Sequence, residues 1–126
     1  MTQIILTPAI RNSESITAWL KQFGKDIPER ARRVVRDSMN RAYDAAQADY
    51  PEDSGETKSK MRKELAEDGF SYRVGFAVND FPPGDFVPGF LEDGTRFMPA
   101  QPRIRPVAKL ERVRFRRDLN QVLRTP

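Results

Sequence analysis

FVPGFLEDGTRFMPAQPRIRPV, the stretch from Phe86 to Val107, contains the strongest structural signals in the chain. Gly94 follows an apolar segment that ends in two acids, and glycine there indicates a sharp reversal of the backbone. The next two prolines fix φ and push their predecessors into extended conformations, which makes the chain after the turn stiff. Pro106 suits the first turn of a helix. The stretch therefore predicts a rigid connection between a sheet and a C-terminal helix.

Three regular elements around this stretch suggest the fold class. An apolar stripe with helical spacing, preceded by a proline and an acid, predicts a long helix from Pro28 to Tyr50. Strict alternation predicts a strand from Phe70 to Val78, and a last helix is expected from Pro106 to Leu123. We expect an α+β fold in which long helices pack on one face of a small, mostly antiparallel β-sheet with projecting loops.

The other segments carry weaker signals. Residues 1–12 are interpreted as a flexible or docking arm, although the apolar run at residues 3–6 also fits a strand. A helix is expected between Ser13 and Gly24. Residues 52–60 and 79–85, rich in polar residues, glycine or proline, predict projecting loops. Residues 60–67 are ambiguous between helix and strand, and 86–91 fit an edge strand or a short helix because of Pro88.

Length and composition limit the classes of protein to consider. The chain has 126 residues, which we interpret as one domain spanning residues 1–126. It has no cysteine and no histidine, which excludes disulfides and thiolate or imidazole metal sites. No apolar run approaches the roughly 20 residues that span a bilayer, and no signal peptide is visible, so we expect a protein made in a reducing cytoplasm without a membrane partner.

Charge is unevenly distributed along the chain. The net charge is +4, but residues 100–126 carry eight basic and two acidic side chains, a balance of +6. Residues 49–93 carry eleven acidic and five basic side chains, a balance of −6. Opposite charges in two parts of one chain favour head-to-tail association of copies, because electrostatics steers association more than it stabilises a fold.

The residues offer little for catalysis. The acids at 49, 52, 53 and 56 lack the spacing of a calcium-binding loop and fit a solvated acidic segment. Ser54 and Ser59 have no histidine as a base, and a lysine partner would need a dry site that this polar loop does not provide. We therefore expect no enzyme, no cofactor and no bound metal.

Two groups of residues are candidates for binding. Glu92 fits either turn capping or a charged contact with a neighbouring subunit, and the second interpretation is favoured slightly. Aromatic residues near turns fit exposed interface anchors, namely Phe81, Phe86 and Phe97.

The arginine-rich C-terminal helix is the third candidate. Arg112, Arg114, Arg116 and Arg117 are suited to phosphate. On a helix, however, they cover two adjoining faces instead of one stripe, and no helix-turn-helix, zinc-finger or RNA-binding signature accompanies them. A solvated helix whose arginines meet partner carboxylates is at least as good an explanation.

The segment FLEDGTRFMPAQPRIRPVAKLE resembles the signature "yvE-x-GT…PaqPFlrPAle" of siphophage head–tail joining proteins. This is the tail-completion or neck family named for gene product ten of a lambdoid phage. The matching positions are Glu92, Gly94, Thr95, Pro99, Ala100, Gln101, Pro102 and Pro106. Arg103 stands where the family usually has an aromatic residue and Val107 where it has alanine. A weaker similarity lies at residues 54–58, where the family often has T-G-x-L-R and Thr57 stands in place of the leucine.

The resemblance implies a structural virion protein, made in the bacterial host cytoplasm, that forms a hexameric ring at the head–tail junction of a tailed phage or prophage. Its partners would be copies of itself, the tail tube protein, the head connector or stopper protein, and DNA passing through the channel. We expect the subunit interface to include Glu92, Asp93, Gly94, Thr95, Arg96, Phe97, Pro99, Gln101, Pro102, Arg103 and Arg105, together with Phe81 and Phe86. Alternatives are a head-closing stopper or adaptor, a basic nucleic-acid-binding protein and, less favoured, a hydrolytic or toxin-like accessory protein.

Overall fold

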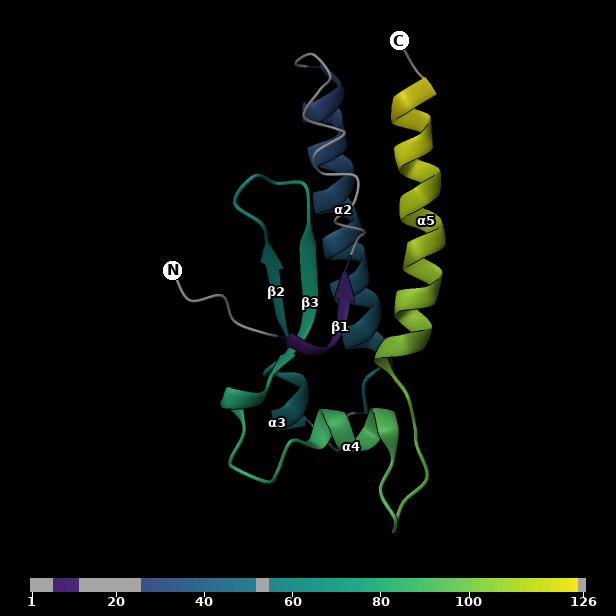
Figure 1. Ribbon diagram of the computed structural model, residues 1–126. Helices are drawn as coiled ribbons and strands as arrows, with labels where there is room; N and C mark the ends of the chain where they lie inside the picture. The colour runs from purple at the N-terminus through teal and green to yellow at the C-terminus, as the bar shows by residue number, and fades with distance from the viewer. Residues whose placement is uncertain (1–5, 12–25, 52–54, 125–126) are drawn as a thin grey trace.

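The computed structural model describes residues 6–11, 26–51 and 55–124 of the chain (Figure 1). A three-stranded antiparallel sheet with strand order β1-β3-β2 forms one layer. Two long helices, α2 and α5, lie side by side and cover one face of that sheet (Figure 1). The expected α+β fold, with helices packed on a small antiparallel sheet, is confirmed.

Helix α2, Asp26–Asp49, forms where the sequence predicts the long helix. Asp26 and Glu29 lie in its first turn, where acids interact favourably with the helix dipole. Its buried stripe follows helical spacing and is rich in small residues, which lets the helix approach the sheet closely: Ala31, Val35, Ser38, Met39, Ala42 and Ala46. Ser38 is the one polar side chain within this stripe.

The sheet places its most apolar strand in the centre. β3, Tyr72–Ala77, pairs with β1, Leu6–Arg11, on one side and with β2, Arg62–Leu65, on the other. The centre of the predicted strand is therefore correct. Val78 is a correction, because it begins a short 3₁₀ helix and its side chain is 49% exposed.

Strand β1 also corrects the interpretation of the first residues. Residues 6–11 pair with β3 as an edge strand, so this part of the expected flexible or docking arm belongs to the sheet. Residues 1–5 and 12, and the helix expected between Ser13 and Gly24, lie outside the described residues.

The expected projecting loops contain short helical segments. Residues 55–58 form one helical turn, α3 (Gly55–Lys58), and 52–54 lie outside the described residues. The 79–85 segment begins in the 3₁₀ helix η3, Val78–Asp80, which Arg62 of β2 fixes through two hydrogen bonds to Asp80. The Asp80 pKa is lowered by these hydrogen bonds from Arg62. Residues 82–85 are exposed, as is Asn79.

The stretch from Phe86 to Val107 contains one helix and the start of another. α4, Val87–Asp93, is the short helix that Pro88 allowed, and α5, Ile104–Arg124, is the C-terminal helix. The connection between them therefore runs from helix to helix instead of from sheet to helix. Pro106 lies in the first turn of α5, as expected.

The buried face of α5 differs from the expected one. Helical spacing in the sequence groups Val107, Leu110 and Val113 in one apolar stripe, and Phe115, Leu119 and Val122 in a partly separate one. The first stripe is wrong as a buried face, since Leu110 is 52% and Val113 67% exposed. The side chains that α5 buries are instead Ile104, Glu111, Phe115 and Leu119. They lie seven, four and four residues apart, which also defines one helical face.

Candidate functional site

The connection between α4 and α5, residues 94–103, protrudes from the body of the protein and is called the arm below (Figure 1). Gly94 ends α4 by donating its backbone N–H to the Phe90 carbonyl at 2.8 Å. Its φ of 76° lies in the left-handed region, and a Cβ there would sit 2.7 Å from the Ala100 nitrogen. The backbone at Gly94 therefore lies so close to the returning backbone at Ala100 that no side chain fits between them.

Glu92 fastens the arm at its base. Its side chain is 2% exposed, and one carboxylate oxygen accepts hydrogen bonds from the backbone N–H groups of Arg103 and Ile104, both at 2.5 Å. These are donors at the start of α5, where an anion is favoured by unpaired N–H groups and the helix dipole. A further backbone hydrogen bond, from Gln101 to the Leu91 carbonyl at 2.7 Å, joins the same two segments.

Glu92 thus takes the capping role, the first of its two interpretations, but caps a helix 11 to 12 residues further along the chain. Asp93, its neighbour, lies outside and forms an ion pair with Arg105 of α5. The fixed base makes the arm a rigid extension of α4 and α5.

The tip of the arm is a tight turn that presents an aromatic ring. Thr95 and Met98 exchange backbone hydrogen bonds of 2.8 and 3.3 Å, and the Thr95 hydroxyl accepts one from the Phe97 N–H. Phe97 is 84% exposed, and the Arg96 guanidinium carbon lies 4.6 Å from the centre of its ring. The remaining predicted interface residues of the arm, Pro99, Gln101 and Pro102, are exposed, and Arg103 is half-buried at its foot.

Phe81 and Phe86 do not share this exposure. Phe81 is 9% exposed and packs edge-on against Phe76 of β3, with ring centres 6.2 Å apart. Phe86 packs on Phe81 with ring centres 5.3 Å apart and is half-buried. The expectation that both are exposed anchors is therefore wrong. Phe81 belongs to the hydrophobic core, and Phe86, just before α4, packs against it.

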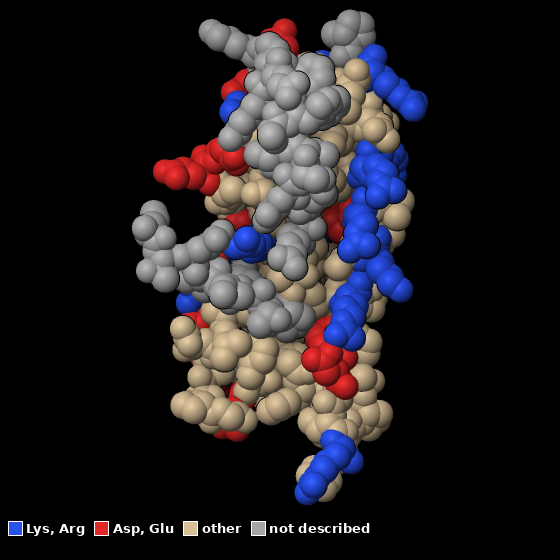
Figure 2. Space-filling model, viewed as in Figure 1, with Lys and Arg blue, Asp and Glu red and all other residues tan. Residues whose placement is uncertain are grey.

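The exposed side of α5 carries a line of cations (Figure 2). Arg105, Lys109, Arg112 and Arg116 are four, three and four residues apart, so they lie on one strip of the helix, called the basic ridge below. All four are exposed. Arg114 and Arg117 lie on other parts of the helix, as the sequence indicated, but Lys109 and Arg105 complete a continuous strip that the sequence analysis did not recognise.

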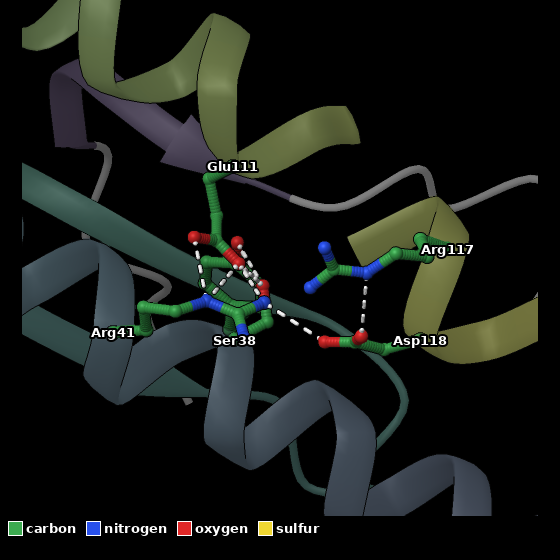
Figure 3. A network of polar contacts seen from close by, with 6 residues as sticks. Ser38, Arg41, Glu111, Arg117 and Asp118 are labelled. Carbon is green, nitrogen blue, oxygen red and sulfur yellow. Dashed lines mark hydrogen bonds and ion pairs between the residues drawn. The ribbon is translucent and has the colours of Figure 1, made fainter. Parts of the chain in front are cut away.

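A buried polar network joins α2, β3 and α5 (Figure 3). Glu111 of α5 is 3% exposed and accepts hydrogen bonds from the Ser38 hydroxyl at 2.8 Å and from Arg41 Nε at 2.9 and 3.0 Å. Arg41 also reaches Asp118 at 3.1 Å. The Ser38 hydroxyl further pairs with the Tyr72 hydroxyl of β3 at 2.8 Å.

Arg41 pairs with both acids of α5, and Arg117 forms a second ion pair with Asp118. The Arg41 pKa is raised above its usual value, mainly by the hydrogen bond to Glu111. A guanidinium is always charged in proteins, so Arg41 keeps its positive charge over the whole physiological pH range. The ion pairs and hydrogen bonds of the network hold α2 and α5 together.

Sequence reasoning missed this network, although two signals were present. Ser38 interrupts the apolar stripe of α2 at a position that must be buried. Glu111 stands between Ile104 and Phe115 on the true inner face of α5. A polar residue on an otherwise apolar helical face predicts a buried hydrogen-bond partner on a facing element.

The chain matches no family model, no curated protein and no solved structure. Within residues 6–11, 26–51 and 55–124, no helix is long and apolar enough to cross a lipid bilayer. What the geometry offers is a fixed, protruding arm and a strip of exposed cations, both of which are suited to contacts with other macromolecules.

The two buried tyrosines predict a loss of stability at alkaline pH. Burial raises the pKa of both Tyr50 and Tyr72 to about 12, with smaller contributions from the negative charges of Glu92 and Glu111. An unfolded tyrosine titrates near pH 10, so between pH 10 and 12 the unfolded state loses these protons first. The two tyrosines therefore do not change the free energy of unfolding below pH 9. From pH 10 to 12 they lower it, by roughly 2–3 kcal/mol per tyrosine.

Urea unfolding between pH 8 and about pH 11.5 checks this expectation. The Tyr50→Phe/Tyr72→Phe double variant should lose most of the decline, which separates these tyrosines from the lysines that titrate in the same range. A decline of equal size in both proteins would contradict the assignment.

Proposed function

We propose that this protein is a structural virion subunit that assembles into a hexameric ring at the head–tail junction of a tailed phage or prophage. In this role it completes the tail, joins it to the head connector and leaves a channel for DNA. It contacts copies of itself, the tail tube protein and the connector, and it catalyses no reaction and needs no cofactor. The ring and its place in the virion follow from the family that residues 90–111 resemble.

The arm is the observation that supports the proposal most strongly. Exposure of a phenylalanine side chain to water is unfavourable, and a fixed aromatic side chain loses little conformational entropy when a partner covers it. The close contact at Gly94 and the cap by Glu92 hold the base of the arm. Phe97 at 84% exposure therefore has the properties of an interface anchor that waits for a partner.

The charge of the arm favours a head-to-tail arrangement of copies. In a two-fold symmetric contact between arm tips, Arg96 of one copy would meet Arg96 of the other, and like charges repel. The tip therefore requires a different patch on the next copy, which is the heterologous geometry that closes into rings. The two sets of opposite charge in residues 49–93 and 100–126 agree with such an arrangement.

Position within the junction separates two versions of this function. A subunit that completes the tail is the version we favour, because the resemblance lies in the tail-completion family. A head-closing stopper or adaptor is the other version. The two versions predict different defects when the protein is missing. The tails are defective in the first case, and the filled heads are defective in the second.

Replacing Phe97 by serine tests the arm. We expect the variant to fold like the unaltered protein, within about 0.5 kcal/mol, because an exposed side chain contributes little to stability. Supplied in place of the unaltered protein during phage production, it should lower the yield of joined virions at least about tenfold, since anchors of this kind contribute about 2 kcal/mol or more. Titre and electron microscopy of the particles give the measurement.

Val78→Ser is the matched control. Val78 is also an exposed apolar residue, at 49%, but it lies in η3 outside the arm. Its replacement should leave the yield unchanged. Equal yields from the two variants would remove the arm from the assembly interface.

A further inference from the structure

The basic ridge on α5 is built from cations that the fold hardly uses. Arg105 pairs with Asp93 at its lower end. Lys109, Arg112 and Arg116 are exposed, and none of them has an ion-pair partner among the described residues. Unpaired, aligned cations on the surface of a small domain produce a strong local positive potential.

The acids of the same helix are already paired with other arginines. Glu111 and Asp118 are the two acidic residues of α5, and both are turned toward Arg41 of α2 (Figure 3). The outer side of α5 is thereby left with basic charges along its length. Figure 2 shows them as an almost continuous blue column over the helix.

We propose that the basic ridge binds the phosphate backbone of duplex DNA without sequence preference. From Arg105 to Arg116 the ridge extends about 16 Å at 1.5 Å per residue. Duplex DNA presents a phosphate charge at every 1.7 Å or so along its axis, so a straight line of cations finds partners in any register. Arginine and lysine along one helix face form the electrostatic footprint of such a contact.

Two other occupants fit less well. A second ridge from another copy would bring cations against cations. Single-stranded nucleic acid is usually held by aromatic side chains that stack on its bases, whereas Phe115, the aromatic residue of α5, is buried. An acidic protein surface is the main alternative, because the exposed Val113 lies four residues from Lys109 and three from Arg116 and offers an apolar contact beside the ridge.

Binding of the full-length chain to a fluorescent duplex of about 20 base pairs, followed by anisotropy at several salt concentrations, tests the proposal. Phosphate contacts by the three unpaired cations, Lys109, Arg112 and Arg116, predict a slope of about −2.7 in a plot of log K against log salt concentration. The Arg112→Gln/Arg116→Gln variant should reduce the magnitude of this slope by about 2 and weaken binding about tenfold or more at low salt.

Arg33→Gln/Arg36→Gln is the matched control, since both arginines are exposed on α2 and the change in net charge is the same. Binding by this control should stay close to that of the unaltered protein, and both variants should unfold at its temperature. Equal losses of affinity in the two variants would show that binding depends on the net charge of the protein and not on the ridge. Absence of binding by the unaltered chain would also overturn the proposal.

A competition experiment distinguishes a phosphate ligand of the ridge from a carboxylate ligand. If polyglutamate displaces the duplex as well as unlabelled DNA does at equal charge concentration, the ridge serves an acidic protein surface and the proposal fails. Arg112 and Arg116 lie outside the arm, so Phe97→Ser should bind DNA like the unaltered protein. Loss of assembly with DNA binding retained would therefore separate the two proposals.

Discussion

Replacing Arg41 by methionine should lower the free energy of unfolding by about 3 kcal/mol, the lower end of the range for breaking a buried ion pair. Glu111 is 3% exposed and would keep only the Ser38 hydroxyl as a partner for a buried negative charge. The lower end applies because the Arg41 side chain is itself 31% exposed and partly screened. Denaturant unfolding at neutral pH measures the change.

Two control variants identify the cause. Arg33→Met removes an exposed arginine from the same helix and should change stability by less than about 0.5 kcal/mol. Arg41→Met/Glu111→Leu removes both charges and should be at least about 1 kcal/mol more stable than Arg41→Met, because no buried charge is left unpaired. A double variant less stable than the single one would mean that packing, and not charge, explains the effect.

Glu92→Ala should have the second largest effect, a loss of about 2–3 kcal/mol. The carboxylate accepts hydrogen bonds from the backbone N–H groups of Arg103 and Ile104, and hydrogen bonds to charged groups contribute more than neutral ones. The substitution also leaves these donors unpaired, and the Ile104 side chain is 1% exposed. Thermal or denaturant unfolding gives the size of the change.

The neighbouring acid provides the control for Glu92. Asp93 is 65% exposed and pairs with Arg105 at the surface, so Asp93→Ala should cost less than about 1 kcal/mol. Limited proteolysis adds a second readout, because a released base should make the arm easier to cleave in Glu92→Ala only. Equal destabilisation by the two alanines would show that the buried cap does not hold the arm.

The sequence was most informative where local signals and burial agreed. The proline and acid before Ala31 predicted α2 to within two residues at its start, and alternation around Val74 located β3. These elements lie in the core, where every second or every third to fourth residue must be apolar. Gly94 was equally clear, because a left-handed backbone conformation favours glycine so strongly.

Features that depend on distant partners were not predicted. Glu111 is buried because Arg41 neutralises it across 70 residues of sequence, and a helix pattern that admits only apolar residues to the core excludes it. The same error placed Leu110 and Val113 inside. Phe81 was expected outside because it follows a turn, but Phe76 and Phe86 enclose it. Whether a residue near a turn is exposed depends on how the chain folds back over it.

The arm illustrates both cases. Its stiffness follows from Gly94, Pro99 and Pro102 and was visible in the sequence. Its protrusion depends on the cap that Glu92 places on α5, which no local pattern specifies. The candidate interface residues of the arm tip, Arg96 and Phe97, are exposed in the structure, and their contact with a partner is a prediction that assembly experiments must test.

Electron microscopy of a lysate in which only this gene is silenced is the most direct test of the junction proposal. We expect filled heads separate from tails, with tails of irregular or excessive length, because the subunit that completes the tail is missing. Tails of normal length beside empty or leaking heads would instead assign the protein to the head side as a stopper or adaptor. Intact virions in normal number would contradict a function at the head–tail junction.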